Sequence, residues 1–171
     1  MLVLPLLLLL VGLVLLWQSS RQRKQAGLPG GRVIYTDTRA WGALDKPLYD
    51  HDLGLTGKPD YLVEHEGQLV PVEVKTGRTP EAPYDSHIFQ VAAYCLLVEK
   101  TYGKRPAYGI IHYPHRDFAV DYTAELESAL LEQLAEMRRD EVRHNVPRSH
   151  EEPMRCRSCG FRKVCDQRLN V

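Results

Sequence analysis

The sequence predicts a single α/β domain in which helices pack on a mixed sheet. The expected elements follow one another as strand, strand, helix, strand, strand, helix, an order typical of such folds. The 171 residues are 44% hydrophobic and 26% charged, close to a soluble globular domain. This composition excludes a disordered, collagen-like or polytopic membrane protein. Because 22 basic side chains balance 22 acidic ones, net charge alone indicates no partner.

The first two strands are expected at residues 61–64 and 69–75, joined by the tight turn Glu66-Gly67. A two-residue loop pairs Glu64 with Leu69 and places Asp60 opposite Glu73. In this register one face carries a mostly apolar set suited to a helix-covered core: Tyr61, Val63, Val70, Val72 and Val74.

The remaining elements are two helices and two strands. A helix is expected at residues 86–102, with Ser86 as its N-cap and Gly103 at its end. Strands follow at residues 107–113 and 118–122. Thr123 is then expected to cap a second long helix, whose buried stripe would be Leu126, Leu130, Leu134 and Met137.

The N-terminus is expected to anchor the protein in a membrane. Residues 1–17 carry no charged group, and a helix of this length is ~25 Å long, within the usable range for a ~30 Å hydrocarbon core. Arg21, Arg23 and Lys24 follow the run, so the positive-inside rule places the rest of the chain in the cytoplasm. We expect an anchor at residues 1–20 and a basic juxtamembrane linker at 21–31. A cleaved signal peptide is the alternative, but its usual flanking features are missing.

Chemistry is predicted on the other face of the hairpin, which carries Asp60, Glu73 and Lys75. Directly opposed like charges cost up to about 1 kcal/mol, so something should offset the repulsion between Asp60 and Glu73. Mg²⁺ or Mn²⁺ would do so, and the Lys75 ammonium could then orient a water or stabilise charge on a phosphorane-like transition state. Two solvated carboxylates on an open sheet face are the alternative.

Three motifs occur in order with short spacing: Gly57-Lys58-Pro59-Asp60, Pro71-Val72-Glu73-Val74-Lys75 and Gln90-x-x-x-Tyr94. They resemble the motifs of the PD-(D/E)xK nuclease superfamily, in its RecB-like branch with a QxxxY motif. The resemblance implies a restriction-endonuclease-like core over residues 32–150 and a Mg²⁺- or Mn²⁺-dependent deoxyribonuclease, in particular an exonuclease acting on single-stranded DNA or DNA ends.

The same resemblance implies roles for individual residues. Asp60 and Glu73 would hold the metal, Lys75 would position or activate water, and Gln90 and Tyr94 would support the site. This branch often has a further, upstream histidine ligand, for which His51 is the nearest candidate, with His87 and His112 as lesser ones.

The last segment, residues 151–171, is expected to be a metal-binding tail. Cys156, Cys159 and Cys165 have metal-ligand spacing and indicate a reducing compartment. They resemble the C-terminal cysteines of the CRISPR-associated iron-sulfur exonucleases, which implies a [4Fe-4S] cluster, although the upstream cysteine of that family is absent before Asp60. A fourth ligand could be Cys95, or His150, which would favour structural Zn²⁺.

The basic side chains of the tail are open to two interpretations. They could contact phosphates or simply be solvated: Arg155, Arg157, Arg162 and Lys163. The sequence as a whole predicts a membrane-anchored nuclease with DNA as its partner. The alternative is a catalytically silent, membrane-anchored DNA-binding or scaffold protein of the same fold, against which the complete set of Asp60, Glu73 and Lys75 argues.

Overall fold

The structure is a computed structural model that describes residues 32–34, 42–43, 46–65 and 67–170. The predicted anchor (1–20) and linker (21–31) lie outside these ranges. Within them, no helix is long and apolar enough to cross a membrane. The chain divides into two compact units, Met1–Gln133 and Leu134–Val171, and each is described by itself.

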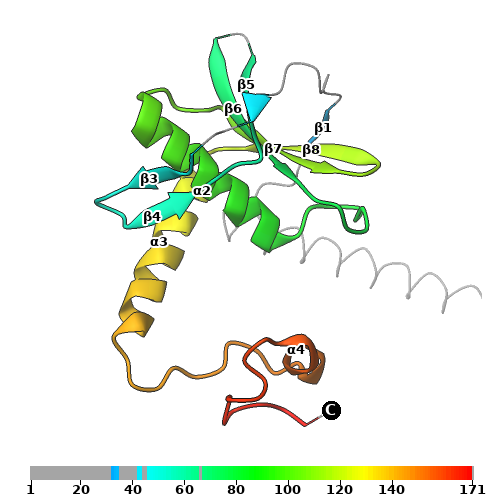
Figure 1. The fold of residues 1–171 in the computed structure, drawn as a ribbon, viewed down its shortest axis with the longest axis vertical. Helices are drawn as coiled ribbons and strands as arrows, with labels where there is room; N and C mark the ends of the chain where they lie inside the picture. Colours follow the sequence, from blue (N-terminus) through cyan, green and yellow to red (C-terminus); the bar gives the residue numbers. More distant parts are fainter. Residues whose placement is uncertain (1–31, 35–41, 44–45, 66, 171) are drawn as a thin grey trace, which may run out of the picture. The chain divides into compact units, whose positions relative to one another are not determined.

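The first unit is built on a mixed six-stranded sheet (Figure 1). Its strand order is β1-β8-β7-β6-β5-β2, in which β6 and β7 run parallel and the other neighbours are antiparallel. The strands are β1 (Arg32–Ile34), β2 (Gly42–Ala43), β5 (Tyr61–His65), β6 (Gln68–Val74), β7 (Tyr108–Tyr113) and β8 (Arg116–Asp121). A separate two-stranded ribbon consists of β3 (Leu48–Asp50) and β4 (Leu55–Gly57).

The predicted hairpin register is confirmed. Glu64 pairs with Leu69, Leu62 with Pro71 and Tyr61 with Val72. Gly67 has φ +75°, a conformation that a tight hairpin turn requires and that glycine adopts without steric cost. The regular ladder begins at Tyr61, so Asp60 lies immediately before β5.

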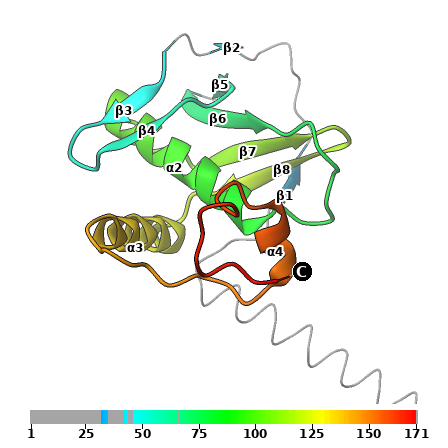
Figure 2. The same ribbon diagram turned by 60° about the horizontal axis from the view of Figure 1, so that its bottom comes forward.

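Helix α2 (Asp85–Tyr102) connects the parallel strands β6 and β7 and lies across one face of the sheet (Figures 1 and 2). It does not cover the face that the sequence predicted, because Leu62 and Leu69 pack with its Leu97, and Glu73 bonds to a side chain of the helix. The valine face forms a separate cluster with Ile110. Strand β6 is thus buried on both faces, as is usual for a strand in a parallel pair.

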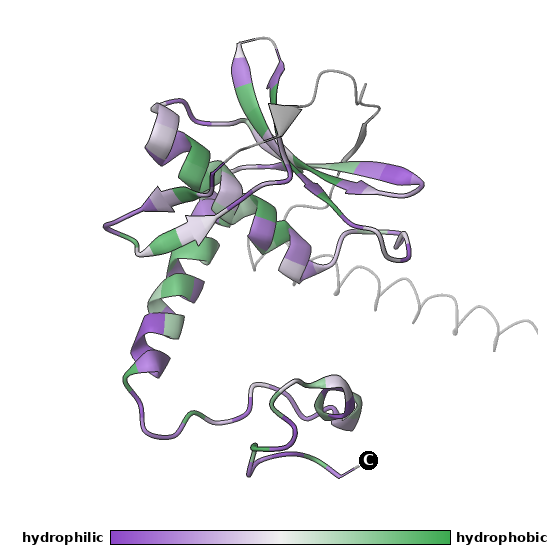
Figure 3. Cartoon of the chain, viewed as in Figure 1, coloured by the Kyte–Doolittle hydropathy of each residue, from purple (hydrophilic) through white to green (hydrophobic). Residues whose placement is uncertain are grey.

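Close packing brings α2 onto the sheet at Gly109 of β7. A Cβ atom at this position would lie 2.3 Å from Val91 Cγ1 and 3.2 Å from Cys95 Sγ, so any side chain would push the helix away. Figure 3 shows hydrophobic residues along α2 and the central strands, and hydrophilic ones at the far end of the β7–β8 hairpin. The absence of a side chain at Gly109 therefore sets the height of α2 above β6 and β7.

The sequence predicted the C-terminal end of α2 correctly but not its N-cap. Gly103 adopts the left-handed conformation with φ +67° and its N–H bonds to the Glu99 carbonyl, as expected for a C-cap. The prediction of Ser86 as the N-cap is wrong. Tyr84 occupies that position without a side-chain cap bond, and Ser86 is inside the first turn.

Helix α3 (Ala124–Glu141) begins as predicted, with the Thr123 hydroxyl accepting a hydrogen bond from the Leu126 N–H. Leu126 and Leu130 are buried. The expected stripe does not continue, because Met137 is 54% exposed.

The second unit contains the short helix α4 (Pro153–Ser158). Arg148 connects the segments before and after α4. Its backbone N–H donates to the Gln167 side chain, and its guanidinium donates to the Gln167 carbonyl and to Glu151. Gln167 in turn donates to Asn145. The tail is therefore folded back on itself by polar contacts rather than by a large apolar core.

Candidate active site

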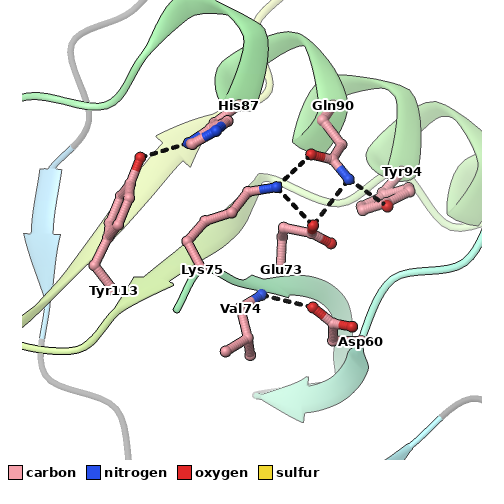
Figure 4. A network of polar contacts seen from close by, with 8 residues as sticks. All are labelled: Asp60, Glu73, Val74, Lys75, His87, Gln90, Tyr94 and Tyr113. Atoms are coloured by element: carbon pink, nitrogen blue, oxygen red, sulfur yellow. Dashed lines mark hydrogen bonds and ion pairs between the residues drawn. The ribbon is translucent and has the colours of Figure 1, made fainter. Parts of the chain in front are cut away.

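Asp60 is placed by a segment that passes close over α2. A Cβ atom on Gly57 would lie 2.9 Å from both the Leu97 and Tyr94 side chains, so only glycine lets β4 run this near the helix. Pro59 is fully buried and fixes the backbone before Asp60. The Asp60 carboxylate then accepts a hydrogen bond of 2.8 Å from the Val74 backbone N–H, which holds it against the end of β6 (Figure 4).

Glu73 lies on β6 under α2 and is only 8% exposed. Its Oε1 accepts hydrogen bonds from Lys75 Nζ at 2.8 Å and from Gln90 Nε2 at 2.9 Å (Figure 4). A carboxylate this buried needs such partners, since an unpaired buried charge is strongly disfavoured. The interpretation of Glu73 as a solvated residue on an open sheet face is therefore wrong.

Gln90 joins the other side chains into one network. Its Oε1 accepts from Lys75 Nζ at 2.7 Å, and its Nε2 donates to the Tyr94 hydroxyl at 2.8 Å as well as to Glu73. Gln90 and Tyr94 are one helical turn apart, so both face the sheet. Burial, opposed in part by the hydrogen bond from Gln90, raises the pKa of Tyr94, and its phenol stays protonated at neutral pH.

Hydrogen-bond donors of the protein thus offset part of the repulsion between the Asp60 and Glu73 carboxylates, a role that the sequence assigned to a metal. Val74 N–H bonds to one Asp60 oxygen, and Lys75 and Gln90 bond to one Glu73 oxygen. In Figure 4 the other oxygen of each carboxylate carries no dashed line. This donor set fits Mg²⁺ or Mn²⁺, which bind through one or two carboxylates and keep several waters.

The predicted histidine ligands lie elsewhere. Among the described residues, no three His, Cys, Asp or Glu side chains gather into a metal-binding group, so His51 does not join the two carboxylates. Its exposed ring, in the turn between β3 and β4, makes an edge contact with Tyr49. His112 pairs with Asp117 on the β7–β8 hairpin, and His87 bonds to the Tyr113 hydroxyl.

Two contributions to the site were not predicted. The Val74 N–H holds Asp60, and a backbone donor leaves no trace in residue identity. Gly57 begins the first motif, and its lack of a side chain lets the segment that leads to Asp60 pass over Tyr94. Its position directly before the Lys-Pro-Asp sequence was the available signal.

The three tail cysteines belong to the second unit. Cys156 is buried on α4 and its sulfur accepts from the Leu169 N–H at 3.4 Å, Cys159 is exposed, and Cys165 is half-buried. All are free thiols. His150 Nδ1 is buried and has no hydrogen-bond partner in the described part of the chain, which makes it an imidazole nitrogen available as a ligand.

Cys95 belongs to the first unit and is fully buried against Gly109. Burial raises the pKa of its thiol. Metal ligation needs the thiolate, so this environment favours the role of a small core residue over that of a cluster ligand.

Comparison with known proteins agrees with this geometry. The family model for the PD-(D/E)XK nuclease superfamily matches residues 13–166, and the chain belongs to this superfamily. Within it the chain is similar to Cas4. It is 30% identical over 149 residues to a CRISPR-associated exonuclease Cas4/endonuclease Cas1 fusion of Myxococcus xanthus, an alignment that covers 82% of this chain and 26% of the fusion protein.

In two unfused relatives the alignment covers a larger share of the relative's own length. The CRISPR-associated exonuclease Cas4 of Rhodospirillum rubrum is 29% identical, with 86% of this chain and 45% of the relative covered. That of Francisella tularensis subsp. novicida is 25% identical, with 67% and 57% covered. The chain thus spans about half the length of these relatives and about a quarter of the fusion protein. The protein in the crystal structure of SSO0001 is 16% identical in sequence to this chain. The two structures superpose with a TM-score of 0.45, and the match covers 94% of this chain and 71% of the SSO0001 chain.

Proposed function

We propose that this protein is a divalent-metal-dependent DNA nuclease whose active site is the Glu73–Lys75–Gln90 network together with Asp60. The observation that carries the proposal is the hydrogen-bonded assembly of all three motifs at the end of β6. Superfamily membership supports it. A silent scaffold would gain nothing from a buried carboxylate paired with a half-buried ammonium in this arrangement, so the non-catalytic alternative is not favoured.

Each side chain has a distinct task in this proposal. Asp60 and Glu73 hold Mg²⁺ or Mn²⁺, which supplies Lewis-acid stabilisation of charge on the phosphate. Lys75 uses two of its three N–H donors on Glu73 and Gln90, which leaves one for a water or a phosphate oxygen. Gln90 and Tyr94 are positioning residues, because they orient Lys75 and Glu73 rather than touch the substrate.

The substrate proposed is single-stranded DNA or a DNA end, cut as by an exonuclease. The support is the name exonuclease carried by the Cas4 relatives. Involvement with a CRISPR system is proposed on the same similarity.

Membrane attachment is a separate proposal that rests on the sequence. Residues 1–20 would anchor the chain and Arg21, Arg23 and Lys24 would keep the nuclease domain cytoplasmic. The superfamily match begins at residue 13, inside the apolar run. Fractionation of cells expressing the full chain, with alkaline carbonate extraction, tests the anchor, and release into the carbonate supernatant would contradict it.

For the tail we propose a structural metal held by Cys156, Cys159 and Cys165. His150 completes a zinc site in this proposal, and its unpartnered buried Nδ1 supports that choice. A [4Fe-4S] cluster with Cys95 as fourth ligand is the competing version. Anaerobic purification followed by metal analysis and absorption spectroscopy separates colourless zinc protein from brown iron-sulfur protein.

The nuclease proposal is tested with the purified full chain and end-labelled DNA, single-stranded or duplex, with free or blocked ends. We expect cleavage in Mg²⁺ or Mn²⁺ that starts from free ends, stops in EDTA and is abolished in Glu73→Gln. A folded wild-type protein that cuts none of these substrates in either metal would overturn the proposal. Equal cleavage by Glu73→Gln would instead remove the site assignment.

A further inference from the structure

A hollow of about 360 Å³ opens directly beside Lys75, within the size range of about 300–1,000 Å³ common for ligand sites. It lies between the end of β6, the loop that follows, the start of α2 and the end of β7. The side chains and backbone that matter here are Lys75, Gly77, Arg78, Tyr84, His87 and Tyr113. The proposed catalytic network uses only Lys75 of this set.

One wall of the hollow consists of rings held in place by one another. The His87 ring contacts Tyr84 edge-on at 5.3 Å between centroids, and His87 Nδ1 lies 2.6 Å from the Tyr113 hydroxyl. Tyr113 is buried and packs edge-on against Phe118. Burial and the Lys75 charge lower the pKa of His87, which keeps its ring neutral at neutral pH. Tyr84 is 53% exposed, which leaves much of its surface uncovered.

The other side of the hollow is cationic. Arg78 is exposed and makes no ion pair or hydrogen bond with the described residues, while Lys75 already balances Glu73. None of the described residues that line the hollow is acidic. The Cβ position of Gly77 is open, so the backbone beside Arg78 leaves room for a ligand. Arg116 of β8 donates a hydrogen bond to the Glu81 carbonyl of the loop between β6 and α2.

An exposed aromatic ring beside an unpaired guanidinium is the chemistry that binds a nucleotide outside a double helix. We propose that this hollow receives one unstacked nucleotide next to the bond that is cut, with its base against Tyr84 and its phosphate on Arg78. A base inside a duplex is already stacked on its neighbours and cannot enter. The inference rests on the proposed nuclease function and deepens it, since it makes single-stranded ends the preferred substrate.

The test uses the full chain in EDTA, where no cleavage occurs, and single-stranded oligonucleotides with one 2-aminopurine at successive positions from the end. Stacking on a tyrosine quenches this base, so one position should lose fluorescence on binding. We expect Tyr84→Ala to abolish that quenching and to raise Kd by about tenfold or more, while Tyr84→Phe keeps both. Arg78→Gln should weaken binding and reduce its salt dependence.

Tyr49→Ala is the matched control, because Tyr49 is 59% exposed on the separate β3–β4 ribbon and should change nothing. Wild-type cleavage in Mn²⁺ combined with unchanged quenching and Kd in Tyr84→Ala would overturn the subsite and leave the nuclease function standing. Tyr84-dependent quenching without cleavage would overturn the nuclease function and keep the subsite. Loss of binding in Tyr49→Ala equal to that in Tyr84→Ala would also overturn the subsite.

Discussion

The end of β6 and the cysteine tail are the two regions where the sequence concentrates chemistry, and they are built in opposite ways. Glu73, Lys75 and Gln90 are already joined by hydrogen bonds of 2.7–2.9 Å under a packed helix. Cys156, Cys159 and Cys165 lie close in sequence but differ in exposure and form no metal-binding group among the described residues. The first region is preorganised by the fold, whereas the second would take its geometry from the metal proposed for it.

Among the side chains that do not hold the metal in this proposal, substitution of Lys75 is expected to have the largest effect. Lys75→Ala should lower the DNA cleavage rate by about 10²–10³-fold, because it removes the donor aimed at the reacting phosphate. The measurement is single-turnover cleavage in saturating Mn²⁺. Lys100→Ala, an exposed cation in the last turn of α2, is the control. An equal loss in both variants would show that Lys75 acts only through overall charge.

A smaller loss is expected for Gln90, which touches the other side chains but no substrate. Gln90→Ala should reduce cleavage by about 10–100-fold, as typical for a residue that orients ligands. It should also raise the Mn²⁺ concentration needed for half-maximal rate, since Glu73 loses a donor. A Gln90→Ala rate within twofold of wild type at all Mn²⁺ concentrations would show that the network is not required.

The packing of α2 on the sheet can be disturbed by a substitution that leaves the active-site side chains unchanged. Gly109→Ala should destabilise the protein by about 1–3 kcal/mol, because the new Cβ would lie 2.3 Å from Val91 Cγ1. Urea unfolding measures this. Gly160→Ala in the second unit, where a Cβ meets nothing within 4 Å, should be nearly neutral. Equal stability of the two variants would contradict the close helix–sheet contact.

The smallest effect on catalysis is expected from the tail. Cys159→Ser should remove the tail metal from the purified protein, and cleavage of a short oligonucleotide should stay within about threefold of wild type, since the site side chains all belong to the first unit. Metal analysis and the same cleavage assay check both statements. Complete loss of cleavage in a folded Cys159→Ser protein would show that the two regions are not independent.

The sequence predicted local features more reliably than contacts between elements. The hairpin register followed from Glu66-Gly67 and strand alternation, and Thr123 was readable as a cap because its hydroxyl acts within one turn. The face covered by α2 was predicted wrongly, since β6 is buried on both sides and a period of two residues does not tell which side the helix covers.

In the candidate site, too, the sequence predicted the residues but not the contacts between elements. Its five residues were named from their motifs, but the bonds that join them depend on where α2 sits. That height is set by Gly109, which no motif contains. Likewise, the burial of Cys95 follows from packing against the same glycine, which no sequence motif reveals.

The central claim is that Asp60 and Glu73 together bind the catalytic metal. Titration of the full chain with Mn²⁺, followed by electron paramagnetic resonance of the free ion, tests it in wild type, Asp60→Asn and Glu73→Gln, with parallel cleavage assays. We predict Mn²⁺ binding in wild type that is lost, together with cleavage, in both variants, while metal held by the tail is unchanged. Undiminished Mn²⁺ affinity and cleavage in Asp60→Asn or Glu73→Gln would contradict the claim.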